Sequence, residues 1–254
     1  MSWAVVAGAS EGLGAAFAAG LAARGHGLVL VARRVERLEA LAATLRERHR
    51  VEVECVGLDL ADADAVPRLV ATLGDREIGV LVCNAAFAPL GAFVDQSAAD
   101  LETALAVNCR APLLLVHALL PAMVARRKGS IIWMSSLTAF QGSPWTSVYG
   151  ATKAFGLAFA EGLWGEVEAS GVQVLVCAAG ATRTPNYLAH AAKGGAPGEL
   201  DPEQVVAETL RHLGRGPLLI PGAFNRFASF LMRRVLPRVT TIRIMAGQTK
   251  KLEG

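Results

Sequence analysis

The chain has 254 residues, of which 53% are hydrophobic and 19% are charged. This composition supplies apolar material for one large core and excludes disorder as a description of the whole chain. Charge is unevenly spread: residues 1–210 carry 16 basic and 21 acidic side chains, whereas nine basic and one acidic side chain follow from Arg211 onward. We expect the basic end to form a subunit contact or part of a substrate rim. A membrane contact is not favoured, and without the aromatic and glycine repeats of RNA-binding proteins we expect no nucleic-acid partner.

The cysteines and the N-terminus bear on compartment and metal content. Cys55, Cys83, Cys109 and Cys177 lack the spacing of metal ligands, so we expect free thiols in a reducing compartment and no metal. The N-terminus shows no basic region followed by an apolar core and cleavage site, and a cytoplasmic location follows as the default. The apolar run 111–125 is interrupted by two prolines and a histidine, which indicates a buried helix.

Short β-rich runs alternate with longer helical patterns along the chain. The predicted strands are 3–7, 28–32, 51–56, 80–83, 130–134, 172–177 and 218–220, and the predicted helices are 13–24, 35–48, 63–73, 98–126, 148–169 and 202–213. The strands are almost continuously apolar, as expected when both faces of a sheet are covered. This α/β pattern predicts one domain over residues 1–254, a doubly wound parallel sheet of about seven strands with helices on both faces.

Helix-start signals and two irregular regions refine this outline. Asp62 is a candidate cap for helix 63–73, Ser97 for helix 98–126, and Asp201 for helix 202–213. Residues 185–200 are rich in glycine and proline and follow the sixth strand, so we expect a substrate lid there. Residues 224–245 form a basic, apolar helical segment interrupted at Pro237.

A glycine-rich run follows the first predicted strand and opens the first helix. Its residues are Gly8, Ala9, Ser10, Glu11, Gly12, Leu13 and Gly14. Glycines at this junction allow a tight turn and let the backbone approach a pyrophosphate at a helix N-terminus. The run therefore indicates a Rossmann-type dinucleotide site.

The end of the second predicted strand indicates which dinucleotide binds. Many such folds place an acidic residue there for the ribose 2′-hydroxyl, but this chain has Arg33 and Arg34 instead. Guanidinium groups recognise a 2′-phosphate, so the sequence predicts NADP(H) rather than NAD(H). The alternative is a solvated arginine pair at the start of the next helix.

Tyr149 and Lys153 lie four residues apart in a predicted helix and so share one face. A nearby cation favours the phenolate, so we expect Lys153 to lower the pKa of Tyr149 and make it a proton donor near neutral pH. An ordinary solvated helix pair is the alternative for these two residues taken alone.

Together these features resemble a short-chain dehydrogenase/reductase with one domain and a Tyr-xxx-Lys pair, along essentially the whole chain. Ser136, thirteen residues before Tyr149, matches the catalytic serine, and Ser135 is its adjacent competitor. Further matches, in chain order, are Asp59 with Leu60, the Asn84-Ala85-Ala86 run, Asn108, Gly180, Thr182 and Thr184. The chain departs from the family pattern at Ala7, Cys83, Ala86 and Ala179, where threonine, asparagine, glycine and proline are usual.

The resemblance implies an NADP(H)-dependent enzyme that interconverts a ketone and a secondary alcohol. Catalysis would rest on Tyr149 as proton donor, Ser136 as hydrogen-bond partner of the reacting oxygen, Lys153 as partner of the tyrosine and ribose, and Asn108 as support for a water relay. The residues implied for cofactor binding are the glycine-rich run without Ala9, both arginines, Tyr149, Lys153 and the further matches named above, except Asn108. A regulatory protein that senses NADP(H) without turnover is the alternative.

Two further expectations concern the substrate and the assembly. We expect a bulky hydrophobic substrate, because the residues expected around it are Phe87, Phe93, Leu137, Phe140, Trp145 and Tyr187. Family members commonly pair their long helices into a four-helix contact. The small-residue face formed by Ala154, Ala158, Gly162 and Gly165 would allow this approach, so we expect a homodimer or homotetramer.

Overall fold

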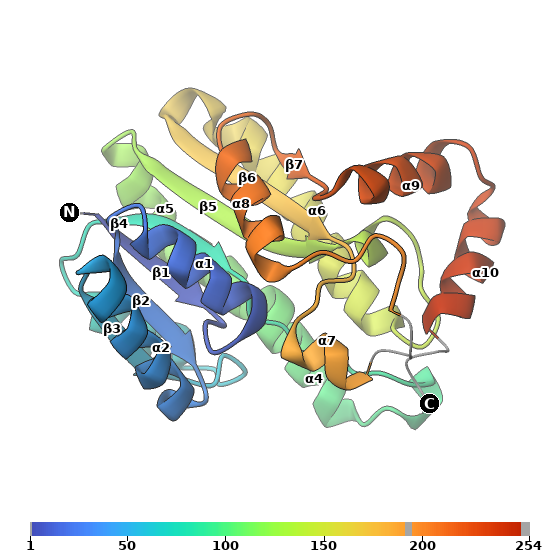
Figure 1. The fold of residues 1–254 in the computed structure, drawn as a ribbon, viewed down its shortest axis with the longest axis horizontal. Coiled ribbons are helices and arrows are strands. Elements are labelled where there is room, and N and C mark those ends of the chain that lie inside the picture. Colours follow the sequence, from blue (N-terminus) through green and yellow to red (C-terminus); the bar gives the residue numbers. More distant parts are fainter. Residues whose placement is uncertain (1, 191–194, 250–254) are drawn as a thin grey trace.

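A computed structural model describes residues 2–190 and 195–249 (Figure 1). Within them, one parallel sheet comprises β1 (Trp3–Ala7), β2 (Gly27–Ala32), β3 (Val53–Gly57), β4 (Ile78–Cys83), β5 (Gly129–Ser136), β6 (Val172–Ala179) and β7 (Leu218–Leu219). The strand order is β3-β2-β1-β4-β5-β6-β7, which confirms the predicted doubly wound sheet. From β1 the chain first adds strands on one side and then, from β4 onward, on the other. Ligands of such folds bind at the carboxyl ends of the strands where this order reverses, here between β1 and β4.

Helices cover both faces of the sheet. On one face lie α1 (Gly12–Ala22), α2 (Val35–His49) and α8 (Pro202–His212); on the other lie α3 (Ala65–Leu73), α5 (Ala111–Ala125) and α6 (Ser147–Val167). Adjacent strand residues supply the two cores, because successive side chains point to opposite faces. Val6 packs in one core with Phe17 of α1, and Val5 packs in the other with Leu115 of α5.

The predicted helix 98–126 contains a change of geometry. It consists of α4 (Ala98–Leu105), a π-helical segment η2 (Ala106–Arg110) and α5. Ser97 caps α4 as predicted, since its Oγ accepts a hydrogen bond from the Asp100 amide at 3.1 Å. By length and composition, residues 98–125 could cross a membrane, but α5 packs its Leu115 and Met123 in the core instead.

The other two predicted helix caps give different outcomes. The Asp62 prediction is wrong: α3 begins only at Ala65, and the Asp62 carbonyl accepts the Ala65 amide in the turn before it. The Asp201 prediction is confirmed, with Pro202 as the first residue of α8 and the Asp201 amide donating to Gln204 Oε1 at 3.0 Å.

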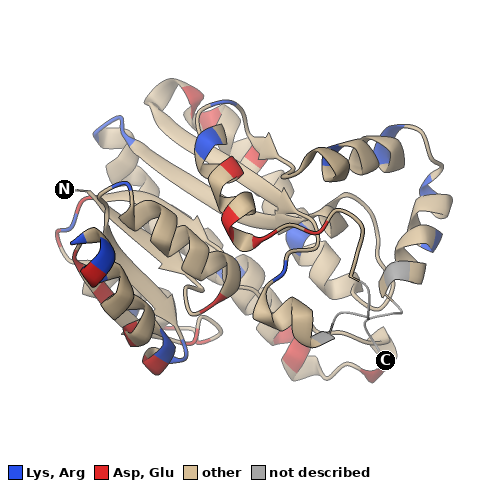
Figure 2. Ribbon diagram, viewed as in Figure 1, with Lys and Arg blue, Asp and Glu red and all other residues tan. Residues whose placement is uncertain are grey.

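The C-terminal part of the chain leaves the body as an arm (Figure 1). It contains α9 (Ala223–Arg234) and α10 (Arg238–Thr249), separated at Pro237, so the predicted segment 224–245 is two helices. Figure 2 shows basic positions and no acidic ones along the ribbon of both helices. The predicted lid begins with a short helix, α7 (Pro185–His190), and its residues 191–194 lie outside the described residues.

Candidate active site

The glycine-rich run forms a loop that only glycine fits at three positions. Gly8 has a φ of +86°, and a β-carbon there would lie 2.6 Å from the backbone of Ala85. At Gly12 a β-carbon would lie 2.8 Å from Thr184, and at Gly14 it would lie 1.9 Å from the Gly8 carbonyl oxygen. The close turn at the N-terminus of α1 fits the pyrophosphate of a dinucleotide.

The loop is held to the end of β4. Asn84 Nδ2 donates a hydrogen bond to the Gly8 carbonyl at 2.8 Å. The Ala7 carbonyl accepts the amides of Asn84 at 3.1 Å and Ala85 at 2.7 Å. Although Ala7 lacks the hydroxyl usual in the family, these backbone bonds still join β1 to the end of β4.

A cleft of about 520 Å³ opens beside this loop. Most predicted cofactor residues line it: Gly8, Ser10, Glu11, Gly12, Leu13, Arg33, Arg34, Asp59, Leu60, Asn84, Ala85, Ala86, Tyr149 and Thr184. The lining does not include Gly14, Lys153, Gly180 or Thr182. Thr182 is buried, and its hydroxyl donates to the Gly180 carbonyl at 3.1 Å; its contact with a cofactor stays a prediction.

Three arginines gather at the end of this cleft nearest β2. The Arg33 side chain is 70% exposed and lies 3.9 Å from the Asp59 carboxylate. Arg34 lies 3.0 Å from the Glu11 carboxylate, and Arg37 bonds the same carboxylate oxygen. Sequence reasoning missed Arg37, which lies in the first turn of α2, three residues after Arg34 at the position that precedes the helix.

Ser136 and Ser135 have different partners at the end of β5, because neighbouring strand residues face opposite sides of the sheet. The Ser136 side chain faces the Tyr149 hydroxyl, and this polar neighbour opposes the rise that burial causes in the pKa of the phenol. Its Oγ also accepts the Thr138 amide at 3.2 Å. Ser135 is buried and donates to the Lys153 carbonyl at 2.9 Å. Ser136 is therefore the serine that faces the tyrosine, and Ser135 anchors α6.

Burial controls the protonation of the Tyr149–Lys153 pair. Lys153 Nζ lies 5.5 Å from the centre of the Tyr149 ring and donates to the Met134 carbonyl at 3.0 Å. Burial lowers the pKa of Lys153 to about 8, opposed by the neighbouring thiols of Cys109 and Cys83. Burial also raises the pKa of Tyr149, and only the Ser136 side chain opposes it.

The prediction that Lys153 lowers the pKa of Tyr149 is therefore wrong for this structure. The ammonium group points to a backbone carbonyl, and removal of the phenol from water has the larger effect. Tyr149 consequently keeps its proton at neutral pH. A neutral phenol beside a serine hydroxyl can still donate a proton to an oxygen that gains negative charge.

Asn108 lies in the π-helical segment, and all its side-chain hydrogen-bonding groups have protein partners. Its Oδ1 accepts the Phe87 amide at 2.8 Å, and its Nδ2 donates to the Phe87 carbonyl at 2.8 Å and to Thr152 Oγ1 at 2.9 Å. The side chain therefore joins the segment after β4 to α6, next to Lys153. This geometry gives Asn108 a positioning role, while the predicted water relay stays a prediction.

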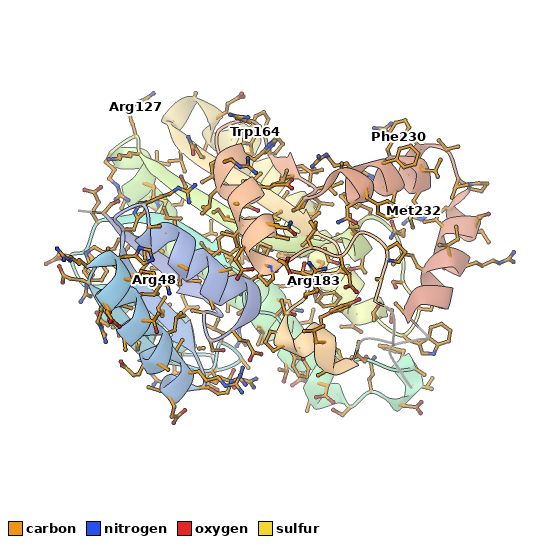
Figure 3. All side chains as sticks on the ribbon, in the orientation of Figure 1. Arg48, Arg127, Trp164, Arg183, Phe230 and Met232 are labelled. Atoms are coloured by element: carbon orange, nitrogen blue, oxygen red, sulfur yellow. The ribbon has the colours of Figure 1, made fainter. Side chains whose placement is uncertain are left out.

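The described part of the predicted lid is tied to the segment before α8. The Tyr187 hydroxyl of α7 donates to Glu199, and burial together with this carboxylate raises the pKa of Tyr187 to about 12. Arg183 Nε lies 2.8 Å from Asp201 Oδ1 (Figure 3). These contacts fix the start of α7 and occupy the hydroxyl of Tyr187, which was expected beside the substrate.

The other residues expected around the substrate have varied positions. Phe87 lines the cleft, and Leu137 and Phe140 belong to the short helix η3 (Leu137–Phe140) directly after Ser136. Phe93 is 59% exposed in the short helix η1 (Phe93–Asp95). The Trp145 carbonyl accepts the Gly91 amide at 3.0 Å. Contact of these residues with a substrate stays a prediction.

The arm also reaches this region, which sequence reasoning did not foresee. The Arg233 guanidinium of α9 lies 4.0 Å from the centre of the Phe140 ring. Asn225, at the start of α9, is buried behind Gly180, where a β-carbon would lie 2.8 Å from its amide nitrogen. No local sequence signal marks either pairing, because both join segments far apart in the chain.

Comparison with known proteins agrees with this geometry. The profile of the short chain dehydrogenase family matches residues 2–193. A 7beta-hydroxysteroid dehydrogenase of Collinsella aerofaciens is 34% identical over 230 residues, covering 88% of this chain and 87% of that protein. A structure solved in a study of 7beta-hydroxysteroid dehydrogenase stereoselectivity is 31% identical, with a TM-score of 0.91 and 96% of each chain covered.

A further solved structure bears on the cofactor. The short-chain dehydrogenase of Sphingobium yanoikuyae, in complex with NADPH, is 35% identical with a TM-score of 0.80, and 87% of each chain is covered. Fold, glycine-rich loop, Ser-Tyr-Lys arrangement and sequence similarity all agree. The chain belongs to the short chain dehydrogenase family and is an NAD(P)-dependent oxidoreductase.

Proposed function

We propose that this protein uses NADP(H) to interconvert a bulky hydrophobic ketone and its secondary alcohol. The observation that carries the proposal is that Ser136 faces Tyr149, which lies next to buried Lys153 and lines the same cleft as the glycine-rich loop. The arginines around Glu11 support a 2′-phosphate, because guanidinium groups pair with phosphate oxygens through two parallel bonds. The NADPH complex of the Sphingobium relative supports the same choice.

The residues of the chain would divide the work as follows. A bound nicotinamide supplies or accepts the hydride at the carbon that changes oxidation state. Tyr149 donates its hydroxyl proton to the carbonyl oxygen during reduction and takes it back during oxidation. Ser136 donates a hydrogen bond to the same oxygen and fixes its direction. Lys153, whose Nζ lies 5.5 Å from the centre of the Tyr149 ring, would bind the nicotinamide ribose and so hold the cofactor beside the tyrosine.

The proposal of a bulky substrate rests on the apolar side chains near the site and on the relatives. Phe87 in the cleft and Leu137 after Ser136 offer apolar surface to a substrate. The Collinsella relative is named for a hydroxysteroid, which is a bulky secondary alcohol. A ketosteroid is therefore the first substrate to test, followed by other polycyclic and long-chain ketones.

The central experiment compares two tyrosine variants in a ketone screen that follows NADPH oxidation. Tyr149→Phe should lose about 10²–10⁴-fold in kcat because the proton donor is removed, while NADPH binding through the glycine-rich loop remains measurable. Tyr187→Phe is the matched control, since the chain has only two tyrosines and Tyr187 is bonded to Glu199. Full reduction by Tyr149→Phe would refute the assignment. NADPH binding without turnover across the screen would favour the alternative of a regulatory sensor.

Cofactor preference has its own test. Arg33→Ala and Arg34→Ala should each raise the Kd for NADPH while leaving that for NADH unchanged, because only NADPH carries the 2′-phosphate. Arg48→Ala, an exposed arginine farther along α2, is the control (Figure 3). An unchanged ratio of the Kd for NADPH to the Kd for NADH in both Arg33→Ala and Arg34→Ala would exclude these arginines as the 2′-phosphate site.

We also propose a homodimer or homotetramer in which the α6 helices approach each other. Gly162 and Gly165 are exposed, and a β-carbon at either position would meet no atom within 4 Å. Such a face allows two helix backbones to come close. Light scattering measures the molar mass of the assembly formed by the full chain. The bulky side chain in Gly165→Trp should keep the α6 helices apart and lower that mass. The cytoplasmic location remains a prediction.

A further inference from the structure

Helix α9 carries its apolar residues on the side that faces solvent. Phe224, Phe227 and Phe230 are 53%, 66% and 61% exposed, whereas Asn225 and Ser229 are buried. Figure 3 shows Phe230 pointing away from the body and Met232 on the opposite side of the helix. A helix on a protein surface normally does the reverse, with apolar residues on the core and polar residues in water.

Contacts on the inner side fix this orientation. Asn225 Nδ2 donates to the Gly198 carbonyl at 3.0 Å and to the Pro221 carbonyl at 3.1 Å. At the other end of α9, Arg233 lies over the ring of Phe140. Rotation of the helix to bury its phenylalanines would break both sets of contacts. The exposed aromatic face is therefore a built feature of the arm.

The size and charge of this face indicate its partner. A phenylalanine presents roughly 150–250 Å² of surface, so three that are more than half exposed leave on the order of 350 Å² uncovered. The exposed side chain of Arg234 follows them in α9, and residues 209–249 contain no acidic residue. We call Phe224, Phe227, Phe230 and Arg234 the arm patch. It requires an apolar partner of negative charge.

The same protein offers such a surface at η1 and the start of α4. Phe93 and Val94 are 59% and 87% exposed. Asp95, Asp100 and Glu102 accompany them, all in exposed or half-exposed positions, and residues 78–109 contain no basic residue. We call these five residues the edge patch. Its composition complements the arm patch in both apolar character and charge.

Within one chain the two patches cannot meet, because α9 and α4 lie well apart across the molecule (Figure 1). Pairing of two arm patches would bring like charges together, which is destabilising. We propose that the arm patch of one copy docks on the edge patch of a second copy. Because Phe93 is also among the residues expected near the substrate, the docked arm would border the partner's substrate entrance.

Disulfide trapping between two differently labelled proteins tests the contact directly. Phe227→Cys protein is mixed with Val94→Cys protein under mild oxidation, and the expected result is a covalent heterodimer on a non-reducing gel. The matched control replaces Val94→Cys by Ala71→Cys, an exposed position on α3, and should give a much weaker band. The native thiols contribute equally to both mixtures. Equal bands from the two mixtures would overturn the proposal.

Charge reversal supplies a second readout in proteins without added cysteines. Arg234→Glu and Asp95→Arg should each weaken self-association by about tenfold in sedimentation velocity, and the double variant should restore it. Loss in both single variants without restoration would overturn the proposed pairing. Binding of the wild-type protein to phosphatidylglycerol vesicles, together with failure of the Phe227→Cys and Val94→Cys proteins to form the trapped dimer, would instead assign the arm patch to a membrane surface. These outcomes do not depend on the proposed enzymatic activity.

Discussion

Replacement of Gly156 by alanine should expose how closely α6 lies on the sheet. A β-carbon at Gly156 would lie 2.0 Å from Nε1 of Trp133, about 1.4 Å short of ordinary contact. The indole is 2% exposed in β5, so it has little room to yield. Overpacking of a core costs about 1–3 kcal/mol, and this overlap belongs at the upper end. Alanine has a higher helix propensity than glycine, which offsets about 1 kcal/mol of this cost.

The expected net loss for Gly156→Ala is therefore about 2 kcal/mol, or roughly a 4–8 °C fall in Tm for a domain of this size. Thermal unfolding followed by circular dichroism measures it. Gly162→Ala is the matched control in the same helix, where an added methyl group meets open space and Tm should stay level or rise. Because α6 carries Tyr149 and β5 ends at Ser136, Gly156→Ala should also reduce kcat.

A double variant separates this steric cause from any general effect of the substitution. Trp133→Phe removes the indole nitrogen that the methyl group would strike. The combined Gly156→Ala/Trp133→Phe protein should then lose less stability than the two single variants added together, with a coupling of about 1 kcal/mol or more. Additive losses, or equal Tm values for Gly156→Ala and Gly162→Ala, would refute the reasoning.

The remaining predictions concern the charged and polar groups of the site. The pKa of Lys153 falls from 10.5 to about 8 on folding, so between these pH values the unfolded state binds more protons than the folded state. The free energy of unfolding of the wild type should therefore rise by roughly 3 kcal/mol as the pH rises through this range. Urea denaturation of Lys153→Met should show no such rise. Asn108→Leu leaves the backbone amide and carbonyl of Phe87 without their hydrogen-bond partner and should lower the free energy of unfolding by about 3 kcal/mol. An unchanged urea midpoint would contradict the positioning role of Asn108. Arg37→Ala leaves the Glu11 carboxylate with one fewer neighbouring cation, so the repulsion between this carboxylate and NADPH should grow. The Kd for NADPH should rise several-fold in a fluorescence titration. The same substitution made in Glu11→Gln protein should leave the Kd unchanged.

The sequence alone determined the features that depend on local pattern. Apolar runs alternating with helical periodicity predict the seven-stranded parallel sheet, and the glycines at 8, 12 and 14 predict the tight turn into α1. The four-residue spacing of Tyr149 and Lys153 places them on one side of α6 because the helix repeat brings such positions together. The choice between Ser135 and Ser136 also follows a strand's alternation, but only the position of α6 shows which side faces the tyrosine.

Tertiary structure decided what depends on desolvation and on contacts between distant segments. The pKa of Tyr149 rises because the fold buries the phenol, an effect that spacing to Lys153 cannot reveal. Asn108 becomes a brace because the π-helical segment brings it to Phe87, 21 residues away in the chain. The aromatic face of α9 has an ordinary amphipathic pattern in the sequence. Only the inner contacts of Asn225 and Arg233 show that this face points to solvent, since periodicity identifies an apolar side of a helix but not what lies against it.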